Sequence, residues 1–495
     1  MQSWIAPFLI TISYLVISTY LGITAKGKLD MSVQENWATA GNSLGLFALV
    51  FLIGAGNVSA YTFLGSPGWA WAKGVPALYV VVYLCTMALT AYLLNPRVSI
   101  LNQKYNIMTE PEGFGIRFES KALRILSAVV AVIASIGAAM VQAIGVGYIL
   151  NVMSGGRIPQ GLGTLIVLVC ICCYVFSSGL KAIGWTNVLQ GALMFVLSFI
   201  IGFYLLNQTT GGLSFQAMFD RVVEISPAHL TLPGALGDMP VKFWVTSILI
   251  STVSYWPQYW LWSTSGKSPE LIRRSATLTP LYYFVMIPMI FVGFMCVYAF
   301  PDAAAQGIPM DKVALTYSMQ HLPWWMMGLL GAGVLAASQS TCESQYHSAT
   351  LAISHDIIAP LNPKVNEGKL QRYLLWVVII GIAFPLALWN PSNLVYILLV
   401  AYGFMGQIFP LIIGMFIWPR MTTAGAFAGL LAGSVVVALF NIVWPNPLGI
   451  HAGIWALMIN IPVNVIVSLC TKPNSEKTLR MFFDDKFMDL AYVRK

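Results

Sequence analysis

The sequence predicts an all-α membrane protein with about thirteen transmembrane helices, and three observations lead to that fold class. Hydrophobic residues make up 58% of the 495 residues and charged residues only 9%, whereas a typical soluble domain carries about 25% charged residues. The mean hydropathy is +0.76. Apolar runs of roughly 20 residues recur along the whole chain, and each is long enough to cross a hydrocarbon core about 30 Å thick.

The predicted spans follow one another with short connections. The first is not a cleaved signal, because no basic residue precedes it and its first lysines, Lys26 and Lys28, follow it. In chain order, the thirteen spans cover residues 4–23, 43–72, 76–96, 125–152, 161–179, 185–206, 241–265, 275–300, 324–352, 372–390, 393–418, 424–443 and 449–470.

The lysines and arginines set the predicted orientation, because basic residues concentrate on the cytoplasmic side. With the N-terminus outside, 21 of the 26 basic residues lie inside. The remaining five, on the outside, are Lys73, Arg157, Arg221, Lys242 and Lys312. We therefore expect a multi-pass protein of the cell membrane with its N-terminus outside and its C-terminus in the cytoplasm. The net charge of +8 is explained by these cytoplasmic anchors, and no basic patch indicates nucleic-acid binding.

No appended soluble domain is expected, so residues 1–495 are predicted to form a single transmembrane domain. The longest loops cover residues 97–124, 207–240 and 301–323, and the predicted cytoplasmic tail, 471–495, is too short for an independent domain. The lack of a signalling domain argues against a sensor built on a carrier scaffold. The five histidines are scattered, and the seven cysteines lie in or at the ends of spans without zinc-site spacing, so nothing indicates an intramembrane enzyme.

Two of the predicted spans carry helix-breaking residues near their middle. The second, FLIGAGNVSAYTFLGSPG, has Gly54, Gly56 and Asn57, and the seventh, STVSYWPQYWLW, has Pro257 with polar neighbours. Five spans separate one break from the next, so each opens a unit of five helices. Interrupted helices at matching positions of two repeats indicate the central site of a transporter. We predict a first repeat over residues 43–206 and a second over 241–418.

The ninth span carries an unusual polar face. Ala337, Ser340, Thr341 and Ser344 follow the i, i+3, i+4, i+7 spacing of one helix face. Glu343 lies beside them, and an ionisable residue at membrane depth suggests a functional site. Unwound helices expose backbone carbonyls that bind cations, and a facing helix adds hydroxyls. Residues 54–58 and 337–341 therefore predict coordination of a monovalent cation such as sodium.

These residues belong to a series of motifs that resembles the sodium:solute symporter family. The motifs are GAGNVSAYTFLGSPG in span 2, GAAMVQAIGVGYIL (137–150), GLKAIGWTNVLQG (179–191), WPQYWLWSTSGKSPELIRR (256–274), and AASQSTCESQ followed by HDI (355–357). The resemblance covers nearly the whole chain. It implies the fold of the bacterial leucine transporter, LeuT, with inverted five-helix repeats over spans 2–6 and 7–11.

The resemblance also implies a sodium site, with Na+ as the co-transported ion. Its ligands, carried over from the family, are the carbonyls of Ala55, Val58 and Ala337 and the hydroxyls of Ser340 and Thr341.

Two departures from the family pattern bear on ion coupling. Proline-type carriers have an aspartate where this chain has Asn57, and many members have Thr-Asp where it has Thr186-Asn187. The missing carboxylate argues against a second sodium ion. Glu343, Ser344 and Asn187 stay a candidate site for a proton or a second cation, so proton coupling through Glu343 is the alternative to sodium.

The solute is expected at the level of the two breaks. No lysine or arginine is predicted deep in any span, so a dianion would lack a partner there. A single carboxylate can be bound by the amides at broken helix ends. We predict a monocarboxylate or a neutral amino acid, with pantothenate or a sugar as alternatives, and no obligate partner besides this solute and the lipid bilayer. The candidate solute residues are Asn57, Tyr61, Gln142, Ser254, Tyr255, Trp256, Tyr402 and Gln407.

Overall fold

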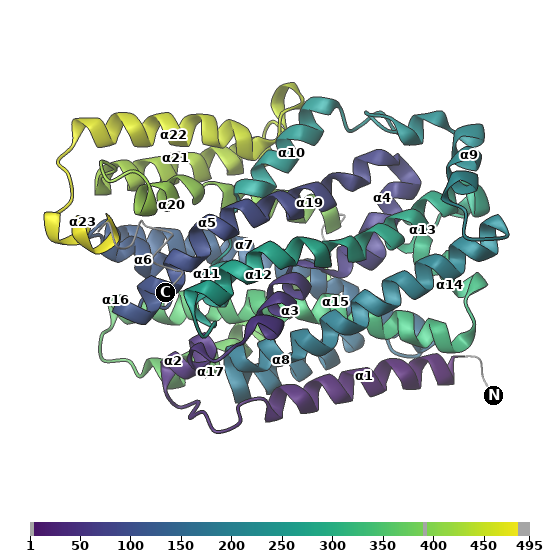
Figure 1. The fold of residues 1–495 in the computed structure, drawn as a ribbon, viewed down its shortest axis with the longest axis horizontal. Coiled ribbons are helices and arrows are strands. Elements are labelled where there is room, and N and C mark those ends of the chain that lie inside the picture. The colour runs from purple at the N-terminus through teal and green to yellow at the C-terminus, as the bar shows by residue number, and fades with distance from the viewer. Residues whose placement is uncertain (1–3, 390–393, 484–495) are drawn as a thin grey trace.

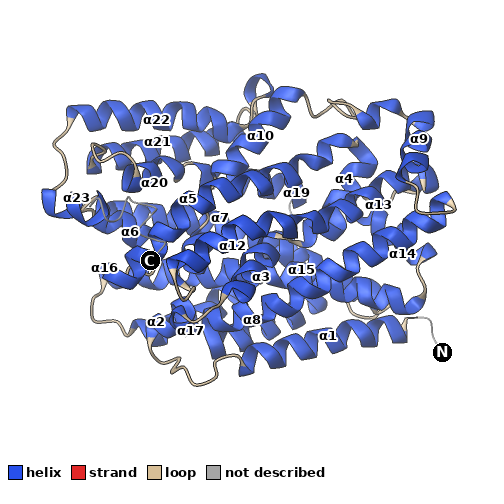
Figure 2. Ribbon diagram, viewed as in Figure 1, coloured by secondary structure: helices blue, strands red, loops and turns tan. Residues whose placement is uncertain are grey.

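The protein is seen in a computed structural model that describes residues 4–389 and 394–483 (Figures 1 and 2). Within these residues every regular element is a helix, apart from one isolated bridge between Leu44 and Gly266. The all-α prediction is confirmed for this part of the chain. The predicted boundary between spans 10 and 11, at residues 390–393, and residues 484–495 of the predicted tail lie outside the described residues.

The predicted spans correspond to single helices, to successive helices or, for spans 5 and 6, to two parts of one helix, because an apolar run favours internally hydrogen-bonded backbone in lipid. The helices that make up the predicted spans are α1 (Ile5–Thr24), α3 (Leu46–Asn57), α4 (Ser66–Lys73), α5 (Tyr79–Tyr105), α7 (Lys121–Met153), α8 (Gln160–Thr210), α10 (Val241–Val253), α11 (Pro257–Thr264), α12 (Pro269–Tyr282), α13 (Met286–Ala299), α15 (Trp324–Leu351), α17 (Glu367–Trp376), α18 (Phe384–Trp389), α19 (Leu394–Gly406), α20 (Phe409–Phe416), α21 (Thr423–Ile442) and α22 (Ala452–Cys470). Connecting helices are α2 (Gln34–Thr39), α6 (Glu110–Arg117), α9 (Phe215–Ile225), α14 (Val313–His321), α16 (Ala359–Leu361) and α23 (Glu476–Phe483).

The number of membrane spans is lower when length and apolarity alone define one. Nine helices of the described chain meet that definition, and the bent pair of α3 and α4 adds a tenth. The expected count of thirteen is therefore not confirmed. Helix α8 counts once although its 51 residues run through predicted spans 5 and 6, with non-helical backbone at Gly179 (φ 52°, ψ −142°) between them. Helix α15 is left out because its polar residues lower its hydropathy.

The long helices run in roughly the same direction, and the connecting helices gather at the two ends of the bundle (Figure 1). Helices α6, α16 and α23 lie at one end, and α9 and α14 lie at the other. These two groups come from loops that the sequence assigns to the inside and the outside, respectively. The arrangement thus places the two groups of loops at opposite ends of the bundle, as the charge pattern predicts.

Helix α15 forms the centre of the bundle. It packs against α1, α3, α7, α8 and α11, and nearly all of its residues are buried. Polar side chains are tolerated on α15 because they contact the surrounding helices and not lipid. Helices α21 and α22 pack side by side along the edge of the bundle (Figure 1). Their outward residues, among them Val435, Ile442 and Ile466, are exposed and apolar, which suits contact with lipid.

Both predicted breaks are present. Helix α3 ends at Asn57, Val58 is extended, and the second half of the span restarts at a bend of 54°. Helix α10 ends at Val253, and Pro257 begins α11, where its missing N–H costs no helical hydrogen bond. Gly56 permits the first break to pack tightly, since a Cβ at that position would lie 2.6 Å from Cζ2 of Trp262 on α11. The end of α3 therefore packs against α11, the second half of the other broken span.

A charged cluster ties the connecting helices together at the α6 end of the bundle. Arg124 Nε donates to Asp356 Oδ1 over 2.8 Å, and His355 lies 3.2 Å from Glu112 and 2.6 Å from Glu367. Burial by itself would lower the pKa of His355, but the carboxylates of Glu112 and Glu367 outweigh it and raise that pKa to about 10. His355 is therefore a cation at neutral pH and links α6 to α17.

Candidate functional site

The predicted sodium ligands come together where α15 crosses the break after α3. Ser340 Oγ lies 2.9 Å from the carbonyl oxygen of Ala337 and 3.4 Å from that of Val58. Thr341 Oγ1 lies 3.5 Å from the Val58 carbonyl oxygen. The Val58 carbonyl is free for these contacts because the extended residue takes it out of the helical hydrogen-bond pattern. Two hydroxyls and two carbonyls thus face one another in a buried position.

The remaining predicted ligand lies on the adjoining turn. The Ala55 carbonyl accepts a hydrogen bond from Val58 N over 3.1 Å, and Ala55 is fully buried. The structure adds Gly56, whose carbonyl oxygen accepts from Thr341 Oγ1 over 3.1 Å; it lies in the predicted range 54–58 but is not among the ligands that the family resemblance implies. All of these groups are neutral oxygens, the ligand type that hard monovalent cations prefer.

The helix after the first break is capped from α7. Ala60 N, which would otherwise be an unsatisfied helix-start donor, donates to Gln142 Oε1 over 2.9 Å. The glutamine of the GAAMVQ motif therefore caps the helix that begins directly after the unwound residues 58 and 59. Gln142 also lines the pocket described next, so the cap and the pocket wall share one side chain.

A central pocket lies between the two breaks. Of the eight candidate solute residues, five line it: Asn57, Tyr61, Gln142, Trp256 and Tyr402. Thr341 lines it as well. The pocket therefore borders the group of hydroxyl and carbonyl oxygens around Ser340 and Thr341, which is called the oxygen cluster below. Among the described residues that line this pocket, none is a lysine, arginine, aspartate or glutamate.

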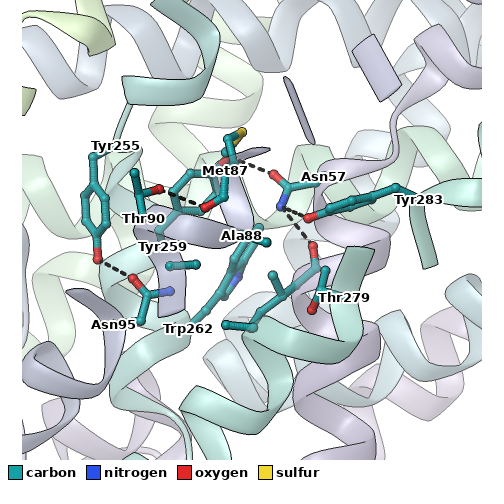
Figure 3. Close-up of a pocket in the computed structure, with 13 residues that line it drawn as sticks. Asn57, Met87, Ala88, Thr90, Asn95, Tyr255, Tyr259, Trp262, Thr279 and Tyr283 are labelled. Carbon is teal, nitrogen blue, oxygen red and sulfur yellow. Dashed lines mark hydrogen bonds between the residues drawn. The ribbon is translucent and has the colours of Figure 1, made fainter. Parts of the chain in front are cut away.

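Asn57 and Tyr259 line both this central pocket and a second one, which lies along α3, α5, α11 and α12 (Figure 3). The amide oxygen of Asn57 accepts from Tyr259 Oη over 2.8 Å, and its amide nitrogen donates to Tyr283 Oη over 3.0 Å. Both sides of the amide are used, so the side chain is fixed between α11 and the residues that follow α12. Tyr255 and Asn95 lie at the far side of this second pocket and are hydrogen-bonded to each other over 3.0 Å (Figure 3).

Three candidate solute residues are not brought to the central pocket. Tyr255 lines the second pocket instead. Ser254 Oγ lies 2.7 Å from the Ile250 carbonyl and 3.0 Å from the Tyr402 carbonyl, so it joins α10 to α19. Gln407 Nε2 donates to the carbonyls of Gly403 and Gly453, which joins α19 to α22. The chain turns between Gly406 and Phe409, and this turn points Gln407 away from the pocket.

Glu343 lies in a separate buried cluster behind the oxygen cluster. Its carboxylate accepts hydrogen bonds from Tyr174 and, over 3.0 Å, from Thr186, both on α8. Ser344 Oγ donates to the Ser340 carbonyl over 3.3 Å, and the fully buried amide of Asn187 has no hydrogen bond within the described chain. The three residues proposed for a proton or a second cation are thus all buried in this region, around α8 and α15.

Sequence reasoning missed two glutamines of the central pocket, Gln258 and Gln345. Gln345 stands four residues after Thr341, so the helical spacing that singled out Thr341 would also have placed Gln345 on that face. Gln258 follows Pro257 in the first turn of α11. Its orientation depends on how the helix restarts after the break, and no periodicity in the sequence sets that.

Comparison with known families matches residues 37–433 to the sodium:solute symporter family. The chain is 30% identical to the uncharacterized symporter YhjB of Bacillus subtilis (strain 168), with 94% of this chain and 97% of the relative covered. It is 26% identical to the sodium/pantothenate symporter of Escherichia coli (strain K12), with 91% and 93% covered.

Two solved structures share the fold. A Na+-coupled sialic acid symporter in a substrate-bound outward-open state superposes with a TM-score of 0.80 at 16% identity, covering 95% of this chain and 99% of the other. The transporter MHP1 of the nucleobase-cation-symport-1 family superposes with a TM-score of 0.55 at 16% identity, covering 90% and 97%. The predicted LeuT-like architecture is thereby confirmed. The chain belongs to the sodium:solute symporter family and is a multi-pass, sodium-coupled carrier of a solute.

Proposed function

We propose that the protein couples inward sodium movement to uptake of a small organic solute with one carboxylate, either a monocarboxylate or a neutral amino acid. The carrier would alternate between outward-facing and inward-facing states. Sodium binds the oxygens of Ala55, Val58, Ala337, Ser340 and Thr341. The solute binds in the central pocket, in contact with Asn57, Tyr61, Gln142, Trp256 and Tyr402.

The observation that carries this proposal is an uncharged pocket that borders the oxygen cluster. Thr341 belongs to both, so the two ligands would lie next to each other. Because no charged side chain lines the pocket in the described chain, a dianion would be buried without a partner. The pocket walls also include Tyr61 and Gln258, at the start of the helical segments that follow the two breaks, and helix starts favour a single negative charge.

Sodium supplies a definite driving force. One sodium ion that moves down a potential of 100 mV releases about 2.3 kcal/mol, and a tenfold concentration gradient adds roughly 1.4 kcal/mol. A monoanion transported with one sodium ion carries no net charge, so only the concentration term acts on it. A zwitterionic amino acid transported with one sodium ion gains both terms, and its uptake produces a current.

The test is a thermal-shift screen of the purified carrier with and without sodium. The screen includes short monocarboxylates, neutral amino acids, pantothenate, choline and hexoses. A ligand that binds the folded state raises its stability. Because the proposed solute site borders the sodium site, we expect a carboxylate to stabilise the carrier only when sodium is present. Proteoliposome uptake of the stabilising compound then separates the electroneutral acid from the current-producing amino acid. Sodium-dependent stabilisation by choline or a hexose, with none from a carboxylate, would refute the solute class.

Proton coupling through Glu343 is the second candidate, favoured by the burial of this carboxyl group beside α8. It predicts uptake that persists in sodium-free buffer, follows an imposed pH gradient and is lost in Glu343→Gln. Uptake that requires sodium at every pH, in both the parent protein and Glu343→Gln, would exclude it.

A further inference from the structure

The central pocket contains polar groups that no protein group satisfies. The amide oxygens of Gln258 and Gln345 accept no hydrogen bond from the described residues, although each side chain is only 3% exposed. The indole N–H of Trp256 and the hydroxyl of Thr62 also lack partners there. All four residues line the same pocket. Buried polar groups are normally paired, and each unpaired group is costly.

The unpaired groups have a defined chemistry. Trp256 can only donate, while the oxygens of the two glutamines can only accept. A solute that satisfies this set needs acceptor atoms for Trp256 and Thr62, and it needs O–H or N–H donors for Gln258 and Gln345. A carboxylate supplies acceptors but no donor. With the two amides oriented as in the structure, an unsubstituted aliphatic acid would therefore leave both glutamine oxygens buried without a partner.

The position of Gln345 constrains the charge of the donor. It stands four residues, or about one turn of 5.4 Å, from Thr341, which is a proposed sodium ligand on the same helix face. A positively charged donor beside Gln345 would repel the bound sodium ion, and no carboxylate lines the pocket in the described chain to offset that repulsion. A neutral hydroxyl or amide N–H is not repelled by the bound sodium ion and needs no carboxylate beside it.

We propose that Gln258 and Gln345 are the specificity-determining residues of the pocket and that the solute is a monocarboxylate that also bears hydroxyl or amide groups. The carboxylate lies toward Trp256 and Thr62, and the neutral donors lie between α11 and α15, where the two glutamines accept from them. This assignment rests on the proposed function, because it takes the single carboxylate from there and narrows the solute within that class.

The experiment compares acids of matched length, measured as sodium-dependent thermal stabilisation of the full-length carrier. One set is butanoate, 2-hydroxybutanoate, 4-hydroxybutanoate and 2-aminobutanoate, and a second set is hexanoate and N-acetyl-β-alanine. We expect a hydroxylated or amide-bearing acid to bind at least tenfold more tightly than the unsubstituted acid and the amino acid. Equal affinity across a set, or preference for the unsubstituted acid, would overturn the proposal.

Variants test the two glutamines directly. Gln258→Leu and Gln345→Leu keep the side-chain volume and remove the amide, so each should reduce the preference for the substituted acid over the unsubstituted acid by about tenfold. Gln371→Leu is the matched control, because Gln371 is equally buried, its amide is also unpaired and it lies on α17 outside the pocket. If a leucine variant does not fold, Gln258→Asn and Gln345→Asn shorten the amide and should weaken the same preference.

The outcomes separate this proposal from the proposed function. If all carboxylates bind with sodium but without preference for hydroxyl or amide groups, the glutamine assignment fails and the proposed function stands. If the preference in the Leu variants of Gln258 and Gln345 equals that of Gln371→Leu, the two glutamines have only a structural role. If sodium-dependent binding is confined to compounds without a carboxylate, the proposed function itself fails.

Discussion

Thr341 shows how one side chain can belong to two binding sites. Its hydroxyl lies 3.1 Å from the carbonyl of Gly56 and also borders the central pocket. Ser340, one residue earlier, reaches the carbonyls of Val58 and Ala337 and does not line the pocket. The two neighbouring hydroxyls thus have different surroundings, and their removal should have different consequences.

We predict that Ser340→Ala and Thr341→Ala both raise the sodium concentration for half-maximal uptake, by about 10-fold to 100-fold. One hydrogen-bonding group at a charge contributes about 1.5–3 kcal/mol, and about 1.4 kcal/mol corresponds to a factor of ten in the sodium concentration. Only Thr341→Ala should also change solute affinity at saturating sodium. Uptake as a function of sodium concentration measures the first effect, and uptake as a function of solute concentration at saturating sodium measures the second.

Ser338→Ala is the control for these variants. Ser338 is equally buried on α15, but its hydroxyl returns a hydrogen bond to the Val334 carbonyl over 2.9 Å within its own helix. Its removal should leave the sodium dependence unchanged. A comparable loss in Ser338→Ala would mean that the effect is structural and that the sodium ligands are wrongly assigned.

Gly56 is decisive for the packing of the two broken spans, because Trp262 occupies the space of its missing side chain. We predict that Gly56→Ala lowers the melting temperature and abolishes sodium-dependent uptake, since an extra methyl group in a packed core costs about 1–3 kcal/mol. The control is Gly137→Ala, where a Cβ meets no atom within 4 Å. A melting temperature of Gly56→Ala equal to that of the parent would show that the contact between α3 and α11 is looser than described.

At the scale of the elements, the charged cluster predicts how stability depends on pH. The pKa of His355 is raised to about 10 from an ordinary value of about 6.5. A raised pKa means that the stabilisation is fully present below pH 6.5 and is lost as the pH rises through about 10. The melting temperature of the purified carrier should therefore fall progressively between about pH 6.5 and pH 10 and level off above that.

His355→Gln should remove most of this pH dependence. It should also lower the melting temperature at pH 7 by about 6 °C, if loss of one partner of a buried pair costs about 3 kcal/mol and each kcal/mol shifts the melting temperature by roughly 2 °C. Arg480→Gln serves as the control because its pair with Glu476 is exposed. If the melting temperature of His355→Gln falls as steeply with rising pH as that of the parent, groups other than His355 cause the fall.

For the whole molecule, the orientation can be tested by labelling from one side of the membrane. With the N-terminus outside, a membrane-impermeant maleimide added to intact cells should label Phe215→Cys in α9 and leave Lys364→Cys, after α16, unlabelled. Cys470 is exposed and should first be replaced by serine. Permeabilised cells provide the control, because both positions should then react. Labelling of Lys364→Cys alone in intact cells would reverse the topology.

The sequence predicted the parts of this molecule that depend on local pattern. Apolar run lengths gave the helices, and Gly56 and Pro257 gave the two breaks. Helical spacing placed Ser340 and Thr341 on one face, where the structure has them. The sequence did not predict side-chain contacts that depend on the direction in which a helix ends or restarts. Gln407 was predicted in the pocket, but the turn after Gly406 carries it to α22. Gln258 was missed because its direction is set by the restart of α11.

The neutral wall of the central pocket has a consequence for the order in which the ligands arrive. Without a charged residue among its described lining, the pocket offers a carboxylate no full positive charge until sodium occupies the oxygens beside Thr341. The anion should therefore bind second, and its dissociation constant should fall as sodium rises. Thermodynamic linkage requires the reverse effect to have the same size, so the solute should tighten sodium binding by the same factor. Calorimetric titrations of each ligand, with and without the other, would measure both factors, and unequal values would show that an additional ion participates.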